Sequence, residues 1–329
     1  MHESPAYRDR DSHSPIFVLT HAHSYSSICT ALLGSHPDLY WFPELRLFNA
    51  HTLGEALDTF GSPRDRLRDA LDPGGDLEDL PVHESDRLRM SGVVRSVAEL
   101  YFGSQSAEEV SRAWSWVRER REMSTAEFFD RLLEKVAPRT GIEKSPDTAA
   151  NDAHLMLCID SYPRARFVHL VRHPVSATES LREKMQDAYA AAHMGERSSK
   201  EVYRRSVRVW FSVNQRIQYF TAGMEDHHVF RVRAEDLLTD SVATAKRFCE
   251  WAGLTAGDDA IAAMLHPEKS PFAHPGPANA QGGEHRKFLA DPTVRPIPSM
   301  GKMDIPPEWG LNRNEERGIV ELARELGYE

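Results

Sequence analysis

Short apolar runs alternate with helical stretches along this chain, and this alternation constrains its fold more than any other feature. IFVLT at 16–20 and ARFVHLVR at 165–172 are compact apolar runs, as buried strands are. LYWF at 39–42 and VFRVR at 229–233 are shorter runs of the same kind. Strands that alternate with helices form βαβ units, in which the strands are parallel and helices cover the sheet. The sequence therefore predicts an α/β fold with a parallel β-sheet flanked by helices.

Helical patterns account for most of the remaining chain. Apolar residues recur at helical spacing through about 52–137, which we interpret as a helical insertion into the α/β domain. The first 14 residues are polar and are expected to be a disordered N-terminus, and no clean linker divides residues 15–329. One domain is the simplest description. Further helices are expected at 26–34, 150–161, after Pro174, at 199–221, at 240–252 and at the end of the chain.

Net charge and cysteine content narrow the class of protein. Fifty acidic and 40 basic residues give a formal net charge of −10, which argues against general binding to nucleic acid or to an anionic membrane. Cys29, Cys158 and Cys249 are far apart in the sequence and lack the spacing of metal ligands. We therefore expect them to be buried free thiols in a reducing compartment. No segment is as long as a membrane span, and the first residues are unlike a signal peptide. We therefore expect a cytoplasmic protein.

Three polar stretches stand where strands of the predicted sheet end. They are THAHSYSS at 20–27, EKSP at 143–146 and RHPVSATES at 172–180. Ligands of parallel α/β sheets bind at the carboxyl ends of the strands. The first stretch has the strand–loop–helix layout of a phosphate site, yet it contains no glycine, lysine or arginine. Such a loop can bind a phosphate through backbone N–H groups at a helix N-terminus and through serine hydroxyls.

The order of these motifs resembles the sulfotransferases that use 3′-phosphoadenosine 5′-phosphosulfate (PAPS). SHPD at 35–38 and PE at 43–44 follow the first helix, and EKSP, ARFVHLVRHPVSATES and RAEDLL come next. The resemblance covers most of residues 15–255 and is greatest to the branch with the tyrosylprotein and many bacterial small-molecule sulfotransferases. It implies a P-loop-like sulfotransferase fold and transfer of a sulfuryl group from PAPS to a hydroxyl or amine. The acceptor would be a small molecule, as in natural-product metabolism, and 3′-phosphoadenosine 5′-phosphate (PAP) would be the product. A homodimer is left open.

The resemblance implies that the first loop wraps the 5′-phosphate of the cofactor. Its cofactor-binding residues would be His23, Ser24, Tyr25, Ser26 and Ser27. The family usually has lysine or arginine where His23 stands and glycine where Tyr25 stands. The histidine can donate a hydrogen bond to the bridging oxygen, and nearby phosphates would favour its charged form. The alternative is a degenerate loop that has lost the cofactor.

The resemblance also implies a site for the 3′-phosphate. Arg172 and Ser180 match the pair that grips this phosphate, and Lys184 matches a basic partner one helical turn further on. The alternative for Arg172 is an ion pair at the end of a strand. Arg286 and Lys287, in GGEHRK at 282–287, are a weaker match to a loop that closes over the nucleotide.

Glu44 and Lys144 are the candidate catalytic residues, together with His23 and His21. Glu44 falls where the tyrosylprotein branch has its catalytic base, and Lys144 matches a lysine that stabilises the transition state. The alternatives are structural pairs, Glu44 with Arg46 and Lys144 with Glu143. His21 is a second candidate base.

Departures from the family pattern keep rival functions open. His23, Tyr25 and Ala234, where the family commonly has tyrosine, favour a sulfotransferase-fold enzyme used for other chemistry, or a non-catalytic protein that binds PAP or another ligand. A kinase is disfavoured because G-x-x-x-x-G-K-[ST] is absent. Two loop histidines, His21 and His23, without a third ligand nearby make a poor metal site, so no metal is expected.

Overall fold

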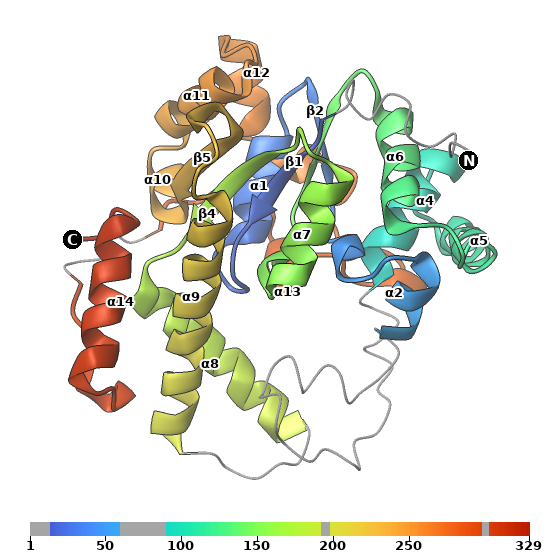
Figure 1. Ribbon diagram of the computed structural model, residues 1–329. Coiled ribbons are helices and arrows are strands. Elements are labelled where there is room, and N and C mark those ends of the chain that lie inside the picture. The colour runs from blue at the N-terminus through green and yellow to red at the C-terminus, as the bar shows by residue number, and fades with distance from the viewer. Residues whose placement is uncertain (1–13, 60–89, 192–197, 298–302) are drawn as a thin grey trace, which may run out of the picture.

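The computed structural model describes residues 14–59, 90–191, 198–297 and 303–329. A five-stranded parallel sheet lies at its centre, with helices flanking it (Figure 1). The strand order β2-β3-β1-β4-β5 places the first strand in the middle. The predicted α/β fold is confirmed. The strands are β1 Ile16–Leu19, β2 Leu39–Phe42, β3 Thr140–Glu143, β4 Arg166–Val171 and β5 Val229–Arg233.

The register of the sheet brings the strand ends to one edge. β1 lies between β3 and β4, with Phe17 opposite both Glu143 and Phe167. The carboxyl end of β2 is also in register with Glu143. Because all these pairings are parallel, the loops that leave β1, β2, β3 and β4 emerge on the same side. The three polar stretches predicted at strand ends are thereby collected at one edge of the sheet.

Most expected helices are present within a residue or two of their predicted bounds. α1 follows β1, α7 lies between β3 and β4 in the chain, and α8 and α9 lie between β4 and β5. The exceptions are the short helices α10, α12 and α13, which the sequence did not predict. The helices here are α1 Ser26–Gly34, α7 Asp152–Ser161, α8 Pro174–Ala191, α9 Ser199–Thr221, α10 Ala234–Thr239, α11 Ser241–Ala252, α12 Asp258–Met264, α13 Arg286–Ala290 and α14 Arg313–Glu325.

The described part of the insertion is helical and packs beside the β2 edge of the sheet (Figure 1). It comprises α2 Leu53–Thr59, α4 Ser91–Phe102, α5 Ala107–Arg118 and α6 Thr125–Val136. Residues 60–89 and the N-terminal residues 1–13 lie outside the described residues, so the expected disorder of 1–14 stays a prediction.

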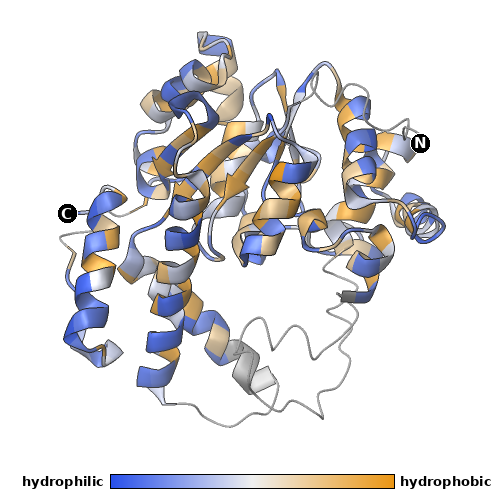
Figure 2. Ribbon diagram, viewed as in Figure 1, coloured by the Kyte–Doolittle hydropathy of each residue, from blue (hydrophilic) through white to orange (hydrophobic). Residues whose placement is uncertain are grey.

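The strands form the centre of the hydrophobic core, as their orange colour in Figure 2 shows. Phe17 packs edge-on to Phe48 with ring centroids 5.0 Å apart, and Phe129 and Tyr162 complete this aromatic cluster. A second core joins α9 and α14 around the fully buried Trp210 and Trp309. The free cysteines are buried, as predicted. Within the described ranges, none of the helices has the length and apolar character needed to cross a membrane.

Candidate functional site

The loop after β1 is held in a backbone conformation that side chains rarely adopt. His23 and Tyr25 have φ angles of 67° and 58°, in the left-handed region that favours glycine. The Tyr25 carbonyl accepts from the Cys29 amide at 3.1 Å, which begins α1. The amides of the first turn, Ser26–Ile28, precede this bond and so point out of the helix end, where an anion is favoured. The loop thus keeps the glycine-like shape expected of a phosphate site, although a tyrosine occupies the position.

The loop serines are turned mainly towards the protein. The Ser24 hydroxyl donates to the His21 carbonyl at 2.7 Å, and Ser27 Oγ accepts from the His285 amide at 3.3 Å. Ser24, Ser26 and Ser27 are all buried. Their expected contacts with a phosphate therefore stay a prediction, and in the structure two of them shape the loop.

His23 bridges the loop to α8. Its Nδ1 lies 3.0 Å from Ser180 Oγ, and its ring meets the His285 ring edge-on with centroids 5.2 Å apart. Burial, and then the charges of Lys184 and His285, lower the pKa of His23 to about 3. This direction is opposite to the one that bound phosphates would produce, so the imidazole is neutral in this state.

Arg172 is the centre of the predicted 3′-phosphate site, and it contacts the loop directly. Its Nε donates to Ser176 Oγ at 2.9 Å, and its two terminal nitrogens donate to the His23 carbonyl at 2.6 Å and to the Tyr25 hydroxyl at 3.1 Å. Its guanidinium carbon also lies 3.8 Å from the centroid of the Tyr25 ring. The structure therefore brings Arg172 and, through His23, Ser180 onto the first loop. Lys184 is exposed on α8 but close enough to influence His23.

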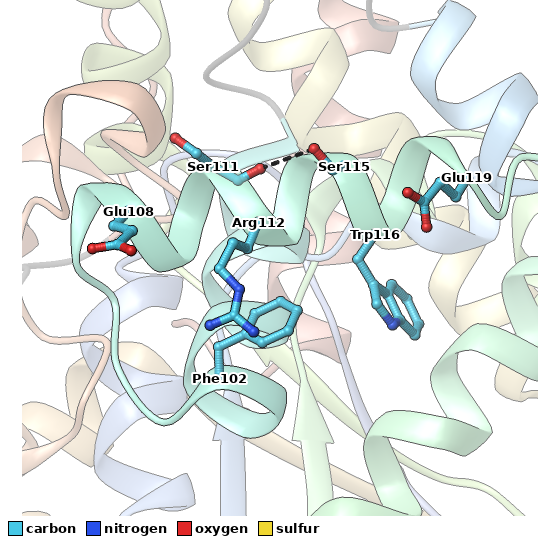
Figure 3. A pocket seen from close by; sticks show the side chains of 7 residues that line it. All are labelled: Phe102, Glu108, Ser111, Arg112, Ser115, Trp116 and Glu119. Atoms are coloured by element: carbon cyan, nitrogen blue, oxygen red, sulfur yellow. Dashed lines mark hydrogen bonds between the residues drawn. The ribbon is translucent and has the colours of Figure 1, made fainter.

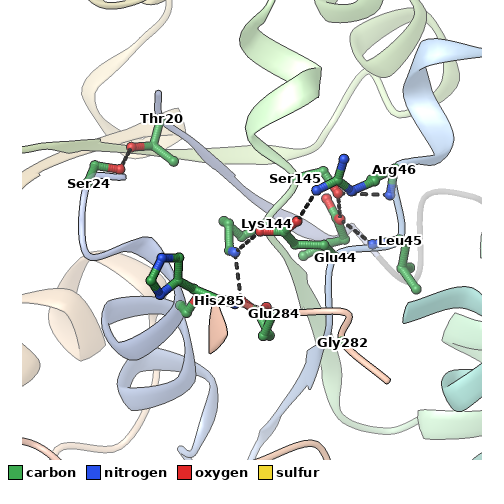
Figure 4. Close-up of polar contacts among 12 residues, drawn as sticks. Thr20, Ser24, Glu44, Leu45, Arg46, Lys144, Ser145, Gly282, Glu284 and His285 are labelled. Atoms are coloured by element: carbon green, nitrogen blue, oxygen red, sulfur yellow. Dashed lines mark hydrogen bonds and ion pairs between the residues drawn. The ribbon is translucent and has the colours of Figure 1, made fainter. Parts of the chain in front are cut away.

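A buried lysine, Lys144, pairs with two carboxylates from distant parts of the chain. Lys144 follows β3, and its Nζ lies 2.6 Å from Glu44 Oε1 and 2.7 Å from Glu284 Oε2 (Figure 4). The Lys144 and Glu284 side chains are fully buried. Arg46 donates to the other oxygen of Glu44 at 2.6 Å and pairs with Asp147 at 2.8 Å. We call Glu44, Lys144 and Glu284 the carboxylate–lysine cluster.

Charge balance makes the two carboxylates of this cluster different. Burial alone would raise the pKa of Glu44, but Lys144 and Arg46 outweigh burial and hold it well below its usual range. Among the described residues Glu284 forms an ion pair with Lys144 alone, so burial prevails and raises its pKa to about 7. Both carboxylates raise the pKa of Lys144 despite its burial, which keeps the ammonium charged.

The sequence left open two structural ion pairs, Glu44 with Arg46 and Lys144 with Glu143. Glu44 does pair with Arg46. Lys144 pairs with Glu44 and Glu284, whereas Glu143 accepts from the Leu45 amide at 3.1 Å and from the Ser145 hydroxyl. Glu143 is therefore a buried carboxylate that fixes the chain after β2.

Glu284 belongs to a segment that is bound to the rest of the site through its backbone. The Glu44 amide donates to the Gly283 carbonyl at 2.8 Å. Arg95, a fully buried side chain of α4, donates to the Gly282 carbonyl at 2.7 Å. A Cβ on Gly92 would lie 2.0 Å from the Glu44 carbonyl oxygen, so this part of α4 packs closely on the backbone of Glu44.

The other predicted residues lie further from these contacts. His21 is buried with Nδ1 2.7 Å from the Ala22 carbonyl, and burial lowers its pKa to about 4. Arg286 and Lys287 are exposed at the start of α13. Ala234 is buried at the start of α10. Among the residues that the structure describes, no three His, Cys, Asp or Glu side chains are arranged to hold a metal ion.

A shallow pocket of about 620 Å³ lies away from this site, along α5 (Figure 3). Arg112 covers the ring of Phe102 there, 4.3 Å from its centroid. None of the predicted site residues lines it. Its lining residues are Phe102, Glu108, Ser111, Arg112, Ser115, Trp116 and Glu119.

Sequence reasoning missed Glu284 and the contact between Tyr25 and Arg172. Glu284 stands in GGEHRK, a segment that drew attention for its basic residues. The weak signal in the sequence was an acid that stands between two glycines and a histidine. A contact between Tyr25 and Arg172 could not be read from residues separated by 147 positions.

The parallel sheet, with polar loops gathered at the carboxyl ends of its strands and Arg172 in contact with the loop after the central strand, has the architecture of α/β proteins that bind ligands at this edge. Residues 15–258 match the sulfotransferase family model. The chain belongs to the sulfotransferase family. Comparison with curated proteins gives no significant match.

Solved structures share the fold at low sequence identity. The sulfotransferase domain from the curacin biosynthetic pathway aligns with a TM-score of 0.68 and 19% identity, covering 96% of this chain and 98% of that one. The sulfotransferase domain of the Synechococcus PCC 7002 olefin synthase gives 0.67 and 19%, covering 96% of each chain. Sulfotransferase STF9 from Mycobacterium avium gives 0.52 and 18%, covering 97% of this chain and 78% of that one. These likenesses concern the fold.

Proposed function

We propose that this protein transfers a sulfuryl group from PAPS to a hydroxyl or amine of a small molecule. Membership of the sulfotransferase family supports the reaction type. The main support for PAPS as the donor is that Arg172, Ser180 and the first turn of α1 meet at the loop after β1. Two of the structural neighbours are sulfotransferase domains, one from the curacin biosynthetic pathway and one from an olefin synthase, which supports a small molecule as acceptor.

The residues present fit an anionic nucleotide. Arg172 has five N–H groups, of which Ser176, His23 and Tyr25 engage three among the described residues, so two can bind a ligand. His23 Nε2 is buried without a hydrogen-bond partner among the described residues. In this proposal Arg172 and Ser180 hold the 3′-phosphate, with Lys184 adding positive charge. The first turn of α1 and the loop side chains hold the 5′-phosphate, while Arg286 and Lys287 contribute from α13.

The carboxylate–lysine cluster supplies the acceptor side of the reaction. Lys144 remains charged in a buried environment, where a fixed cation stabilises developing negative charge more effectively than in water. A carboxylate of the cluster takes the proton of the acceptor as it attacks sulfur. His21 and His23 are the further candidates for proton transfer, and both have lowered pKa values because of burial.

Calorimetry with PAP tests the donor site, with 5′-AMP as the matched ligand that lacks the 3′-phosphate. We expect PAP to bind much more tightly than 5′-AMP. Equal affinities would contradict the 3′-phosphate site, and a complete lack of PAP binding would favour the rival in which the fold serves other chemistry. Radiolabelled PAPS with a panel of phenols, alcohols and amines then tests transfer. Binding without turnover on the whole panel would favour a non-catalytic binding protein.

A further inference from the structure

We propose that Glu284, rather than Glu44, accepts the proton of the acceptor molecule. This inference rests on the sulfuryl transfer proposed above and names a residue for one of its steps. It follows from how the two carboxylates of the carboxylate–lysine cluster are bound, and from where Glu284 lies relative to α1.

Only one of the two carboxylates has an oxygen outside an ion pair. Lys144 occupies Oε1 of Glu44, and Arg46 occupies Oε2. Glu284 uses only Oε2 for Lys144, and its Oε1 is buried without a hydrogen bond among the described residues. A buried polar atom without a partner is costly and calls for an explanation. An acceptor hydroxyl or amine that donates to Oε1 would supply the missing hydrogen bond.

Glu284 also lies next to the helix end where the donor is expected. The amide of the neighbouring His285 donates to Ser27 Oγ in the first turn of α1, and the nearby Ser27 side chain slightly favours the charged form of the Glu284 carboxyl. Because the first turn of α1 is the proposed site of the 5′-phosphate, the sulfuryl group attached to that phosphate would lie near this point. The Glu44 carboxylate, by contrast, is paired with Lys144 and Arg46.

The backbone holds Glu284 in place. Its segment is fixed by the bond from the Glu44 amide to the Gly283 carbonyl and by the bond from Arg95 to the Gly282 carbonyl. The Ser91 hydroxyl donates to the Gln281 carbonyl at 3.0 Å. A catalytic side chain needs this kind of support to be positioned before the reaction.

Proton affinity agrees with this geometry. A general base works best when its pKa is near the working pH, and burial places the pKa of Glu284 near neutrality while Lys144 and Arg46 hold that of Glu44 far lower. The Glu284 carboxyl is influenced by Lys144, which favours its charged form, and by Glu44, which opposes it. Further charged or titratable groups of the neighbourhood are Arg46, Arg95, Glu143 and His285.

The step balances without a further reactant. The acceptor oxygen or nitrogen forms a bond to sulfur, and the bond from sulfur to the bridging oxygen of the 5′-phosphate breaks, leaving its electron pair on PAP. The acceptor proton moves to Glu284 Oε1. The carboxyl then becomes neutral, and Lys144 remains paired with Glu44. The proton returns to water after product release.

Glu284→Gln tests the proposal, with Glu143→Gln as the matched control, because burial raises the pKa of Glu143 to about 7 as well. Carbon-13 NMR of protein labelled at the glutamate carboxyl carbon follows each carboxylate without any substrate. We expect a carboxylate resonance that titrates near neutral pH to be lost in Glu284→Gln and kept in Glu143→Gln. Retention of every such resonance in Glu284→Gln would overturn the proposal.

A second experiment measures kinetics with radiolabelled PAPS and an acceptor from the panel of phenols, alcohols and amines that the wild type sulfates. Glu284→Gln should lower kcat about a hundredfold or more and remove the decline of kcat on the acidic side, with PAP affinity unchanged by calorimetry. Glu143→Gln should keep that decline. Unchanged kcat and pH profile in Glu284→Gln would assign the proton to another group and leave the proposed function intact. If the wild type binds no PAP and transfers nothing, the proposed function fails, and this inference fails with it.

Discussion

Tyr25 lies flat against Arg172, with the guanidinium carbon 3.8 Å from its ring centroid and its hydroxyl accepting an Arg172 N–H at 3.1 Å. The residue that departs most from the family pattern in the loop is thus in contact with the residue that matches it best. The stacking and the hydrogen bond offset part of the strain of a tyrosine in the left-handed region.

Tyr25→Phe tests what the phenol does for ligand binding. The variant keeps the stacked ring and frees one further N–H of Arg172 for the 3′-phosphate. We expect PAP to bind more tightly by about 0.5–1.5 kcal/mol, the range of one hydrogen bond. Calorimetry measures the change, and 5′-AMP serves as the control ligand whose affinity should stay constant. Weaker PAP binding would mean that the hydroxyl contacts the nucleotide.

Arg172→Ala should weaken PAP binding by about 1.5–3 kcal/mol, the range for hydrogen bonds to charged groups. Arg208→Ala, at an exposed position of α9, is the control that should leave the affinity unchanged. Because Arg172 also bonds the His23 carbonyl, thermal unfolding of both variants must be compared. A folded Arg172→Ala protein with wild-type affinity would remove the main support for the donor site.

His23 is expected not to titrate on the alkaline side of the pH profile. The sequence suggested a histidine that replaces a permanent cation, but burial and neighbouring cations lower its pKa to about 3, so the ring is already neutral at pH 7. The alkaline limbs of turnover in wild type and His23→Arg should therefore coincide at saturating donor. A wild-type decline that the arginine variant lacks would show that bound phosphates raise the pKa of His23 above neutrality.

Acid should destabilise the fold through His169. This side chain is fully buried in β4, with Nε2 3.0 Å from Asn214 Oδ1, and burial lowers its pKa to about 3. The unfolded chain binds a proton near pH 6.5 and the folded chain does not, so stability is full above that pH and falls as the pH drops towards 3. At pH 5 this one histidine lowers the free energy of unfolding by about 2 kcal/mol relative to neutral pH.

Urea unfolding of wild type and His169→Gln at pH 7.5 and pH 5 measures this effect. The substitution should reduce the loss of unfolding free energy on acidification, while the exposed His227→Gln should not change it. An equal loss in wild type and His169→Gln would contradict the role of His169.

Much of the fold could be predicted because its signals are local. The runs at 16–20, 39–42 and 229–233 became β1, β2 and β5 because compact apolar runs have few alternatives to buried strands. β3, TGIE, was not identified as a strand, since it is four residues long and carries a glycine and a charge. α13 was not predicted, because it has only five residues, among prolines and glycines.

The site could be predicted only in part, because its chemistry depends on contacts between distant segments. Arg172, Ser180 and Lys144 were found by motif, and the structure brings each to the same edge of the sheet. Their partners were not visible. That both oxygens of Glu44 are engaged by cations follows from side chains that meet only after the sheet has formed.

The ion pair between Lys144 and Glu284 closes a loop of 140 residues. In a ribosome-bound chain, the strands around Lys144 can assemble well before residue 284 has been made. Until then Lys144 lacks one of its two carboxylate partners, Glu284. The Glu44 amide likewise lacks its bond to the Gly283 carbonyl. Long-range closure of this kind is slow in folding. The proposed sulfuryl transfer would therefore begin only when the segment that contains Glu284 has docked, so that activity itself reports a late step of folding.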